Sequence, residues 1–127
     1  MSAAVAVQIK SHRDLIAWQK AMDLVVLIYE CTAGFPKHEL YGLTSQIRRA
    51  ATSIPANIAE GQGRRSKAEF GQFLGNARGS LLELDTHLEV ALRLKYLTPA
   101  QHQRVHQHVV EVGRIVNGLL RSLTSNL

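Results

Sequence analysis

Positively charged residues cluster beside a glycine-rich stretch near the middle of the sequence. Gly61-Gln62-Gly63 is followed directly by Arg64, Arg65 and Lys67. Cations beside the free N–H groups that open a helix are well suited to binding phosphate. The residues that we predict as phosphate contacts for a nucleic acid are Arg48, Arg49, Arg64, Arg65, Lys67 and Arg78. An ordinary solvated run of charge is the alternative interpretation.

A row of polar residues at helical spacing precedes this cluster. Its members are Gln46, Arg49, Ser53, Asn57 and Glu60. One interpretation is a partly buried structural seam, in which these side chains bond to one another and to carbonyls freed by Pro55. The other is a polar pocket for a small ligand. A buried polar group without a partner costs about 1–3 kcal/mol, so a buried seam would need internal partners.

Other familiar chemistry is not indicated by the sequence. Of the six histidines, His102 and His106 stand one helical turn apart, but no H-E-x-x-H or Glu-x-x-His pattern accompanies them. No strand-borne nucleophile motif and no G-x-x-x-x-G-K-[ST] loop occurs. We therefore predict no catalytic residues, no metal site, no cofactor and no enzymatic activity.

The composition is that of a single globular domain whose positive charge is unevenly distributed. The chain has 127 residues, of which 46% are hydrophobic and 20% charged, with a net charge of +5. Six cations and two carboxylates, Glu60 and Glu69, lie between Arg48 and Arg78, a local excess of four. This excess favours an anionic partner. Aromatic residues make up only 6%, which favours recognition of the nucleic-acid backbone over base stacking.

The sequence predicts a soluble, cytoplasmic protein with no membrane partner. The longest uninterrupted apolar run, Leu24 to Tyr29, is far shorter than the roughly 20 residues of a membrane helix, and no leader sequence is indicated. The single cysteine, Cys31, cannot form an intrachain disulfide and is expected to be a small buried apolar residue.

Residues 1–12 are predicted to form a flexible tail, and residues 13–125 a single domain. We expect the first helix to start near Asp14 as N-cap and to end at Gly34-Phe35-Pro36. Leu24 to Tyr29 is apolar all round the helix. One face should therefore pack inside the domain and another against a second subunit.

The second helix should begin near Glu39 or Tyr41. Its apolar positions continue on both sides of Pro55, so we expect a kink there rather than an end. Gly61-Gln62-Gly63 is predicted to break the chain between the second and third helices.

Ser66 and Glu69 have the spacing of a capping box at the start of a third helix that reaches about Lys95. Within it, Gly71, Gly75 and Gly79 predict a flat groove that admits a close neighbour, although tolerated small surface residues are the alternative.

The fourth helix should be capped by Thr98, Pro99 and Gln101, and it carries a heptad of apolar residues from Val105 to Leu123. No segment alternates with the period of a strand. The sequence therefore predicts an all-α fold, an antiparallel up-down-up-down four-helix bundle.

Several long stretches resemble a known family. "DLIAWQKAMDL" (14–24), "FPKHELYGLTSQIRRAATSIPANIAEGQGRRS" (35–66) and "EFGQFLGNARGSLLELDTHLEVALRL" (69–94) are similar to the 23S rRNA intervening-sequence proteins, a family of four-helix bundles. That family includes the accessory variability determinant of diversity-generating retroelements. Residues that match its polar signature and loop are Glu39, Gln46, Arg48, Arg49, Ser53, Asn57, Glu60, Gly61, Gly63 and Arg64.

The resemblance implies a cyclic homopentamer with a basic surface. Members are not known as enzymes, and the retroelement members bind nucleic acid and a reverse transcriptase. Our leading hypothesis is a non-enzymatic, oligomeric bundle that binds RNA or DNA. The alternatives are a protein-interaction scaffold, for example for a reverse transcriptase, and a small-ligand site in the Gln46 to Glu60 row.

Overall fold

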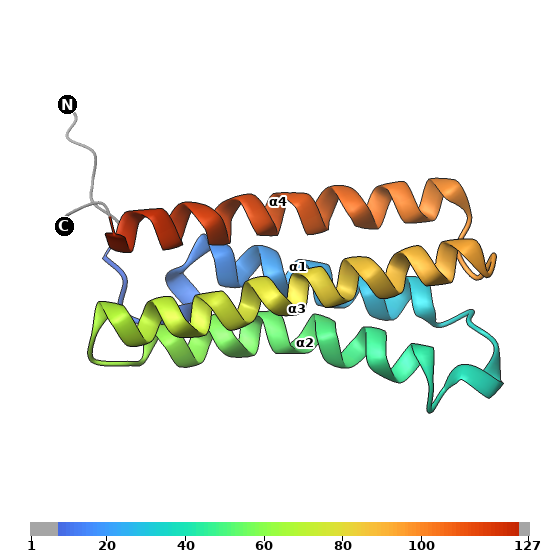
Figure 1. Ribbon diagram of the computed structural model, residues 1–127, viewed down its shortest axis with the longest axis horizontal. Helices are drawn as coiled ribbons and strands as arrows, with labels where there is room; N and C mark the ends of the chain where they lie inside the picture. Colours follow the sequence, from blue (N-terminus) through green and yellow to red (C-terminus); the bar gives the residue numbers. More distant parts are fainter. Residues whose placement is uncertain (1–7, 125–127) are drawn as a thin grey trace.

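The structure, a computed structural model, describes residues 8–124 as an all-α bundle (Figure 1). Its helices are α1 (Ile16–Thr32), α2 (Leu43–Gln62), α3 (Lys67–Arg93) and α4 (Pro99–Thr124). Two short 3-10 turns, η1 (His12–Asp14) and η2 (Lys37–Glu39), precede α1 and α2. Residues 1–7 of the predicted tail and residue 125 of the predicted domain lie outside the described residues. The predicted fold class is confirmed.

Each helix packs against the next one in the sequence, and α4 returns to pack beside α1. Figure 1 shows the helices lying side by side along the long axis, with the end of α4 at the same end of the bundle as the α2–α3 turn. This is the up-down-up-down arrangement that short connections between successive helices favour.

The core is built from one apolar stripe on each helix. α1 buries Leu24 and Ile28, and α2 buries Ile47 and Ile54. The heptad predicted for α4 forms its inner face, with Val105, Val109, Val112 and Val116 buried and Leu119 and Leu123 packed against the core. Burial of each such side chain contributes about 1.5–3 kcal/mol relative to exposure, so this shared interior is the main source of stability.

The first helix starts one residue later than predicted, with Leu15 as its N-cap, and the second starts at Leu43 rather than near Glu39 or Tyr41, because 3-10 turns come first. Asp14 does not cap α1; it closes η1, where its Oδ2 accepts hydrogen bonds from the N–H groups of Lys10 (2.8 Å) and Ser11 (3.1 Å). Glu39 ends η2, and its Oε1 accepts from the N–H of Leu43, the first residue of α2, at 3.2 Å. The Asp14 carboxylate therefore caps the 3-10 turn before α1, and the Glu39 carboxylate bonds to the first residue of α2 from the turn that precedes it.

α2 continues through Pro55, as predicted, and the proline ring is buried. Its missing N–H leaves the carbonyl of Ala51 without the usual helical donor. Side chains bond to neighbouring carbonyls in the same region: the Ser53 hydroxyl donates to Ala50 at 2.8 Å and the Asn57 amide to Ser53 at 2.8 Å. Pro55 therefore lies inside one helix, and the kink at Pro55 stays a prediction.

Gly61 does not break the helix; it lies inside α2 and is buried. A Cβ atom added to Gly61 would lie 2.7 Å from the Cβ of Phe73 and 3.0 Å from the Cδ1 of Phe70. The small size of glycine, rather than its conformational freedom, is what this position requires. The helix ends one residue later, at Gln62, with Gly63 as its C-cap.

The cap predicted for α4 is present, and the capping box predicted for α3 forms only its first half. Ser66 Oγ accepts from the N–H of Glu69 at 3.1 Å. Thr98 and Gln101 bond reciprocally, at 2.9 and 3.1 Å. α3 itself stops at Arg93, and Lys95 adopts a left-handed conformation with φ of 65°. The N–H of Tyr96 bonds to the carbonyl of Ala91, which is the Schellman pattern of helix ends.

The glycines of α3 have no close neighbour among residues 8–124. Around a Cβ added to Gly75 or Gly79 there is nothing within 4 Å, and at Gly71 only the Cδ1 of Leu123 approaches, at 3.9 Å. If these glycines admit a close neighbour, it has to come from outside the part of the chain that the structure describes.

Candidate nucleic-acid interface

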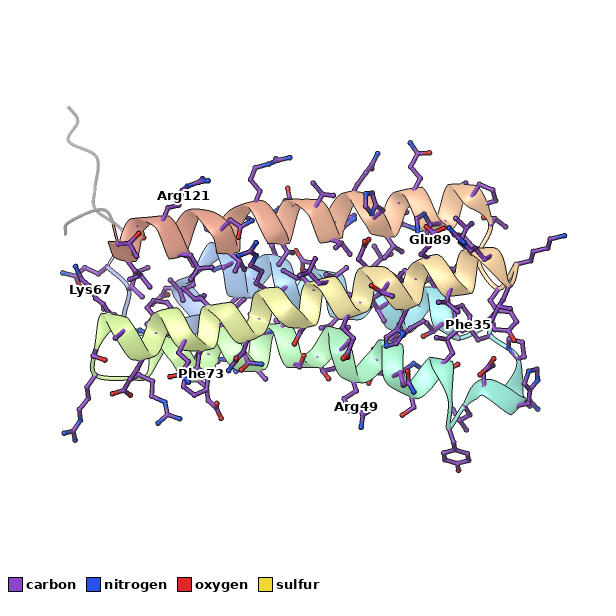
Figure 2. The ribbon with its side chains drawn as sticks, in the orientation of Figure 1. Phe35, Arg49, Lys67, Phe73, Glu89 and Arg121 are labelled. Carbon is purple, nitrogen blue, oxygen red and sulfur yellow. The ribbon has the colours of Figure 1, made fainter. Side chains whose placement is uncertain are left out.

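Three of the predicted cations lie together at one end of the bundle. Arg64 and Arg65 occupy the α2–α3 turn, Lys67 opens α3, and all three are exposed. Figure 2 shows Lys67 at this end of the molecule. Within residues 8–124, no carboxylate lies within ion-pair distance of any of the three. Their charges are therefore available to an external anion.

An aromatic ring holds one of these cations in place. The guanidinium carbon of Arg64 lies 4.7 Å from the ring centroid of Phe73, a cation–π arrangement. Such a contact contributes about 0.5–1 kcal/mol at an exposed site. It uses the face of the guanidinium and leaves its N–H groups free to bind phosphate oxygens.

The other three predicted cations lie apart from this group. Arg48 and Arg49 precede Arg64 by 16 and 15 residues on α2, which corresponds to more than about 20 Å along the helix axis. Figure 2 shows Arg49 projecting away from the bundle on the α2 side. Arg78 lines a groove between α3 and α4. A single subunit therefore does not join the six predicted residues into one surface.

The fold brings further cations to the α2–α3 end that we did not predict. The start of α1 and the end of α4 meet there, since Leu15 and Leu119 line the same groove. Figure 2 shows Arg121 of α4 at the same end as Lys67. We call the resulting set the basic end: Lys10, Arg13, Arg64, Arg65, Lys67 and Arg121.

The three additional cations are Lys10, Arg13 and Arg121. The up-down-up-down topology predicted from sequence places the start of the first helix and the end of the fourth at the α2–α3 end, so these cations could have been predicted there. Three carboxylates, Asp14, Glu60 and Glu69, lie in the same segments, so the basic end keeps an excess of three positive charges. Asp14 is already engaged by two backbone N–H groups.

The helix dipoles add little at this end. The starts of α1 and α3 meet the ends of α2 and α4 there, so the partial charges of opposite sign largely cancel. The Ser66 hydroxyl also accepts one of the N–H groups of the first turn of α3. Side-chain cations, rather than free helix N–H groups, therefore make this surface attractive to phosphate.

The polar row on α2 is split between interior and surface. Ser53 and Asn57 are half-buried, and the Ser53 hydroxyl hydrogen-bonds to the hydroxyl of Ser80 on α3 at 2.6 Å. Gln46, Arg49 and Glu60 are exposed. The half-buried pair joins α2 to α3, and the row is not a continuous buried seam.

Histidines and carboxylates pair across α3 and α4. His106 Nδ1 lies 3.1 Å from Asp85 Oδ1, and His102 Nε2 lies 3.8 Å from Glu89 Oε1. The two imidazole rings stack with centroids 5.9 Å apart. Across residues 8–124 no group of three or more potential ligands is placed to hold a metal ion.

The groups whose pKa is shifted lie away from the basic end. Hydrogen bonds from the N–H of Leu43 and the hydroxyl of Tyr96 lower the pKa of Glu39, and the same carboxylate raises the pKa of Tyr96. Burial raises the pKa of Cys31 to about 11. All three groups lie at the opposite end of the bundle, where Glu39 links η2 to Tyr96 and to the start of α2.

Residues 13–118 match the family model of the 23S rRNA-intervening sequence protein. The chain belongs to this family. A solved structure from Bacteroides thetaiotaomicron, described as a protein of unknown function from the S23 ribosomal protein family, is similar to this 23S rRNA-intervening sequence family member. The two share 25% sequence identity with a TM-score of 0.75, over 84% of this chain and 99% of the other. A search of curated proteins gave no match. Within the described part of this family member, none of the helices has the length and apolar character to cross a bilayer.

Proposed function

We propose that this protein is a non-enzymatic, oligomeric bundle that binds the phosphate backbone of RNA or DNA through its basic end. The observation that carries the proposal is the group Arg64, Arg65 and Lys67, which is exposed and unpaired among the described residues. Cations that are paired with carboxylates of their own chain would add little to the affinity for phosphate. Unpaired cations add to the affinity, because they release counterions from the nucleic acid when they bind its phosphates.

The distribution of charge makes oligomerisation important for affinity. An excess of three charges at the basic end gives only weak, salt-sensitive binding when it acts alone. Several copies on one nucleic acid act together, because each further contact becomes intramolecular. The proposal therefore includes a homo-oligomer, with the pentamer as the stoichiometry that the family resemblance suggests.

Two apolar surfaces support assembly. On α1 the side chains of Ile16 and Val26 are 61% and 55% exposed. On α3 Leu82 is 63% exposed beside a groove of about 270 Å³ that Val110 and Gly113 of α4 also line. Contact between two different surfaces generates a ring when the rotation closes. In a ring with the bundles parallel, every basic end faces the same side.

The test of nucleic-acid binding is fluorescence anisotropy with a structured RNA and a DNA duplex of equal length at rising salt. Replacing Arg64 and Arg65 by alanine should weaken binding and reduce the slope of log K against log salt by about 1–2, the loss of one or two phosphate contacts. The matched control replaces Arg93 and Arg104, two exposed arginines at the opposite end. Equal losses in both double variants, or no binding at low salt, would refute the proposed surface.

Assembly is tested by light scattering, in which a monomer has a mass of 14.1 kDa. The wild type should give a multiple of this mass. Val26→Glu places a charge on the apolar face of α1 and should release monomers, whereas Thr52→Glu, on exposed α2 surface, should not. A wild-type monomer at micromolar concentration would contradict the oligomer.

The exposed apolar side chains also favour a second candidate, a scaffold that docks another protein such as a reverse transcriptase. This role predicts complexes that persist at high salt and tolerate Arg64→Ala with Arg65→Ala. The nucleic-acid role predicts the reverse, because phosphate contacts are lost as salt rises.

A further inference from the structure

A small pocket lined by both polar and apolar side chains lies at the end of the bundle opposite the basic end. It has a volume of about 120 Å³ and is formed where α1 ends, η2 turns and α2 begins. Thr32, Lys37, Thr44 and Arg48 contribute its polar side chains, and Phe35 and Leu40 are among its apolar walls. Two of these polar residues are cations, and none is a carboxylate.

The guanidinium of Arg48 is held in one orientation. Its Nε donates to Thr32 Oγ1 at 3.0 Å, and its guanidinium carbon lies 4.6 Å from the ring centroid of Tyr29. Thr32 is 2% exposed, and its hydroxyl donates its own proton to the carbonyl of Ile28 at 2.7 Å. Its lone pairs are thereby directed to Arg48. These contacts use the Nε and one face of the guanidinium.

The remaining N–H groups of Arg48 have no acceptor among residues 8–124, and no carboxylate there lies within ion-pair distance. A half-buried cation without a counterion is costly. Arg48 is therefore oriented as an anion ligand at the edge of a pocket, with its bidentate donors unused.

Thr44 is a second polar group in need of a partner. The residue is 4% exposed, and its Oγ1 has no hydrogen-bond partner in the described structure. A buried hydroxyl in that state costs about 1–3 kcal/mol. The Oγ1 atom is enclosed, so a ligand recovers this cost when the Thr44 side chain rotates toward the pocket that the residue lines. Lys37, on η2 at the rim, adds a second positive charge.

We propose that this pocket binds one phosphate-sized oxyanion, with Arg48 as its main ligand and Lys37 and Thr44 as further contacts. The volume of about 120 Å³ leaves room for a tetrahedral oxyanion. It is well below the roughly 300–1,000 Å³ of sites that enclose a whole drug-sized molecule. The pocket thus fits free phosphate or a terminal phosphate group whose remainder stays outside.

The carboxylate of Glu39 on η2 already accepts two hydrogen bonds, which limits its repulsion of an anion in the pocket. Its Oε1 accepts from the N–H of Leu43 and its Oε2 from the hydroxyl of Tyr96 at 2.9 Å, and it does not line the pocket. These donors partly neutralise the carboxylate. The inference is independent of the proposed role of the basic end and gives Arg48 a task separate from Arg64 and Arg65.

The experiment is a titration with inorganic phosphate at constant ionic strength, followed by backbone and arginine Nε signals in ¹H–¹⁵N NMR. Saturable shifts at Thr44, Lys37 and the Arg48 Nε are expected. Arg48→Gln should weaken the affinity at least tenfold and Thr44→Val several-fold, while the matched control Arg93→Gln leaves it unchanged. Arg64→Ala with Arg65→Ala should also leave this titration unchanged, which separates the pocket from the nucleic-acid surface.

A second arm identifies the source of the phosphate. A short oligonucleotide with a 5′-phosphate is compared with the same oligonucleotide lacking it; a preference for the former assigns the pocket to nucleic-acid ends, and equal behaviour assigns it to free phosphate. If Arg48→Gln fails to fold, Thr44→Val carries the same test. Absence of saturable shifts, or shifts that both pocket variants retain in full, would overturn the proposal and leave the pocket to water.

Discussion

Gly61→Ala should destabilise the bundle, although the substitution replaces glycine by a better helix former. Gly61 lies inside α2 and is buried against α3. The added methyl carbon would lie 2.7 Å from the Cβ of Phe73, 3.0 Å from the Cδ1 of Phe70 and 3.3 Å from its carbonyl oxygen. The Cβ of Phe73 is fixed by its backbone, so rotation of a side chain cannot remove the shortest contact. α2 and α3 have to separate locally.

The magnitude follows from two opposing effects. Overpacking of this kind costs typically about 1–3 kcal/mol, and a contact with fixed atoms belongs near the upper end. Alanine in a helix interior returns about 0.5–1 kcal/mol relative to glycine. The free energy of unfolding should therefore fall by about 1–2 kcal/mol. For a domain of this size that corresponds to a decrease in Tm of roughly 3–8 °C.

The assay is urea unfolding followed by circular dichroism at a fixed protein concentration, because an oligomer makes apparent stability depend on concentration. Gly63→Ala is the matched control. Its added methyl would meet only the carbonyl oxygens of Glu60 and Ala59, at 3.6 and 3.7 Å, and its φ of −78° suits alanine. The control should equal the wild type or exceed it by up to about 1 kcal/mol. If Gly61→Ala is as stable as Gly63→Ala, the close approach of α2 to α3 is refuted.

Three further predictions concern the opposite end of the bundle. Lys95→Gly should raise the free energy of unfolding by about 0.5–1 kcal/mol, because φ is 65° there; Lys95→Ala should bring no such gain in the same urea assay. The pKa of Glu39 is lowered from 4.5 in the folded state, so its contribution to stability is present above pH 4.5 and is lost as the pH falls through the folded pKa. Thermal unfolding between pH 3 and 7 should show Tm falling at low pH in the wild type and falling less in Tyr96→Phe. Identical profiles of Tm against pH would contradict a stabilising hydrogen bond between Tyr96 and Glu39. The pKa of Cys31 is raised to about 11 by burial, so the native thiol should react with a disulfide reagent at pH 8 many times more slowly than the urea-unfolded chain. Equal rates would show that the thiol is accessible.

The helices could be predicted because their signals are local. The reciprocal cap of Thr98 and Gln101 lies within four residues, and the heptad of α4 needs only its own spacing. Gly61 and Asp14 were misassigned because their roles depend on what lies around them. A glycine that breaks a helix and a glycine that lets two helices touch look the same in sequence, and an aspartate caps a 3-10 turn as well as an α-helix.

The candidate site was predictable to the extent that its residues are neighbours in sequence. Arg64, Arg65 and Lys67 are together because one turn carries them. Arg121 lies near them only because α4 returns to the same end of the bundle, and the order of the helices in space, not the local sequence, shows this. Arg48 was predicted as a phosphate contact only because it carries a positive charge. Its contacts with Thr32 and Tyr29 join α2 to α1, and the spacing of residues along one helix does not show them.

The proposed function constrains the symmetry of the assembly. Six cations that have no carboxylate partner among residues 8–124, those of the basic end, lie at one end of an elongated bundle. A two-fold dimer with antiparallel bundles would place the basic ends at opposite extremes, and two distant weak sites add little when the ligand cannot span them. A cyclic assembly keeps the bundles parallel and collects every basic end on one rim. Nucleic-acid binding that depends on Arg64 and Arg65 and disappears with Val26→Glu, while the variant stays folded, is therefore expected for an assembly that brings the basic ends together, as a parallel ring does. Binding by the monomer at undiminished affinity would mean that one basic end is enough and that assembly has another purpose.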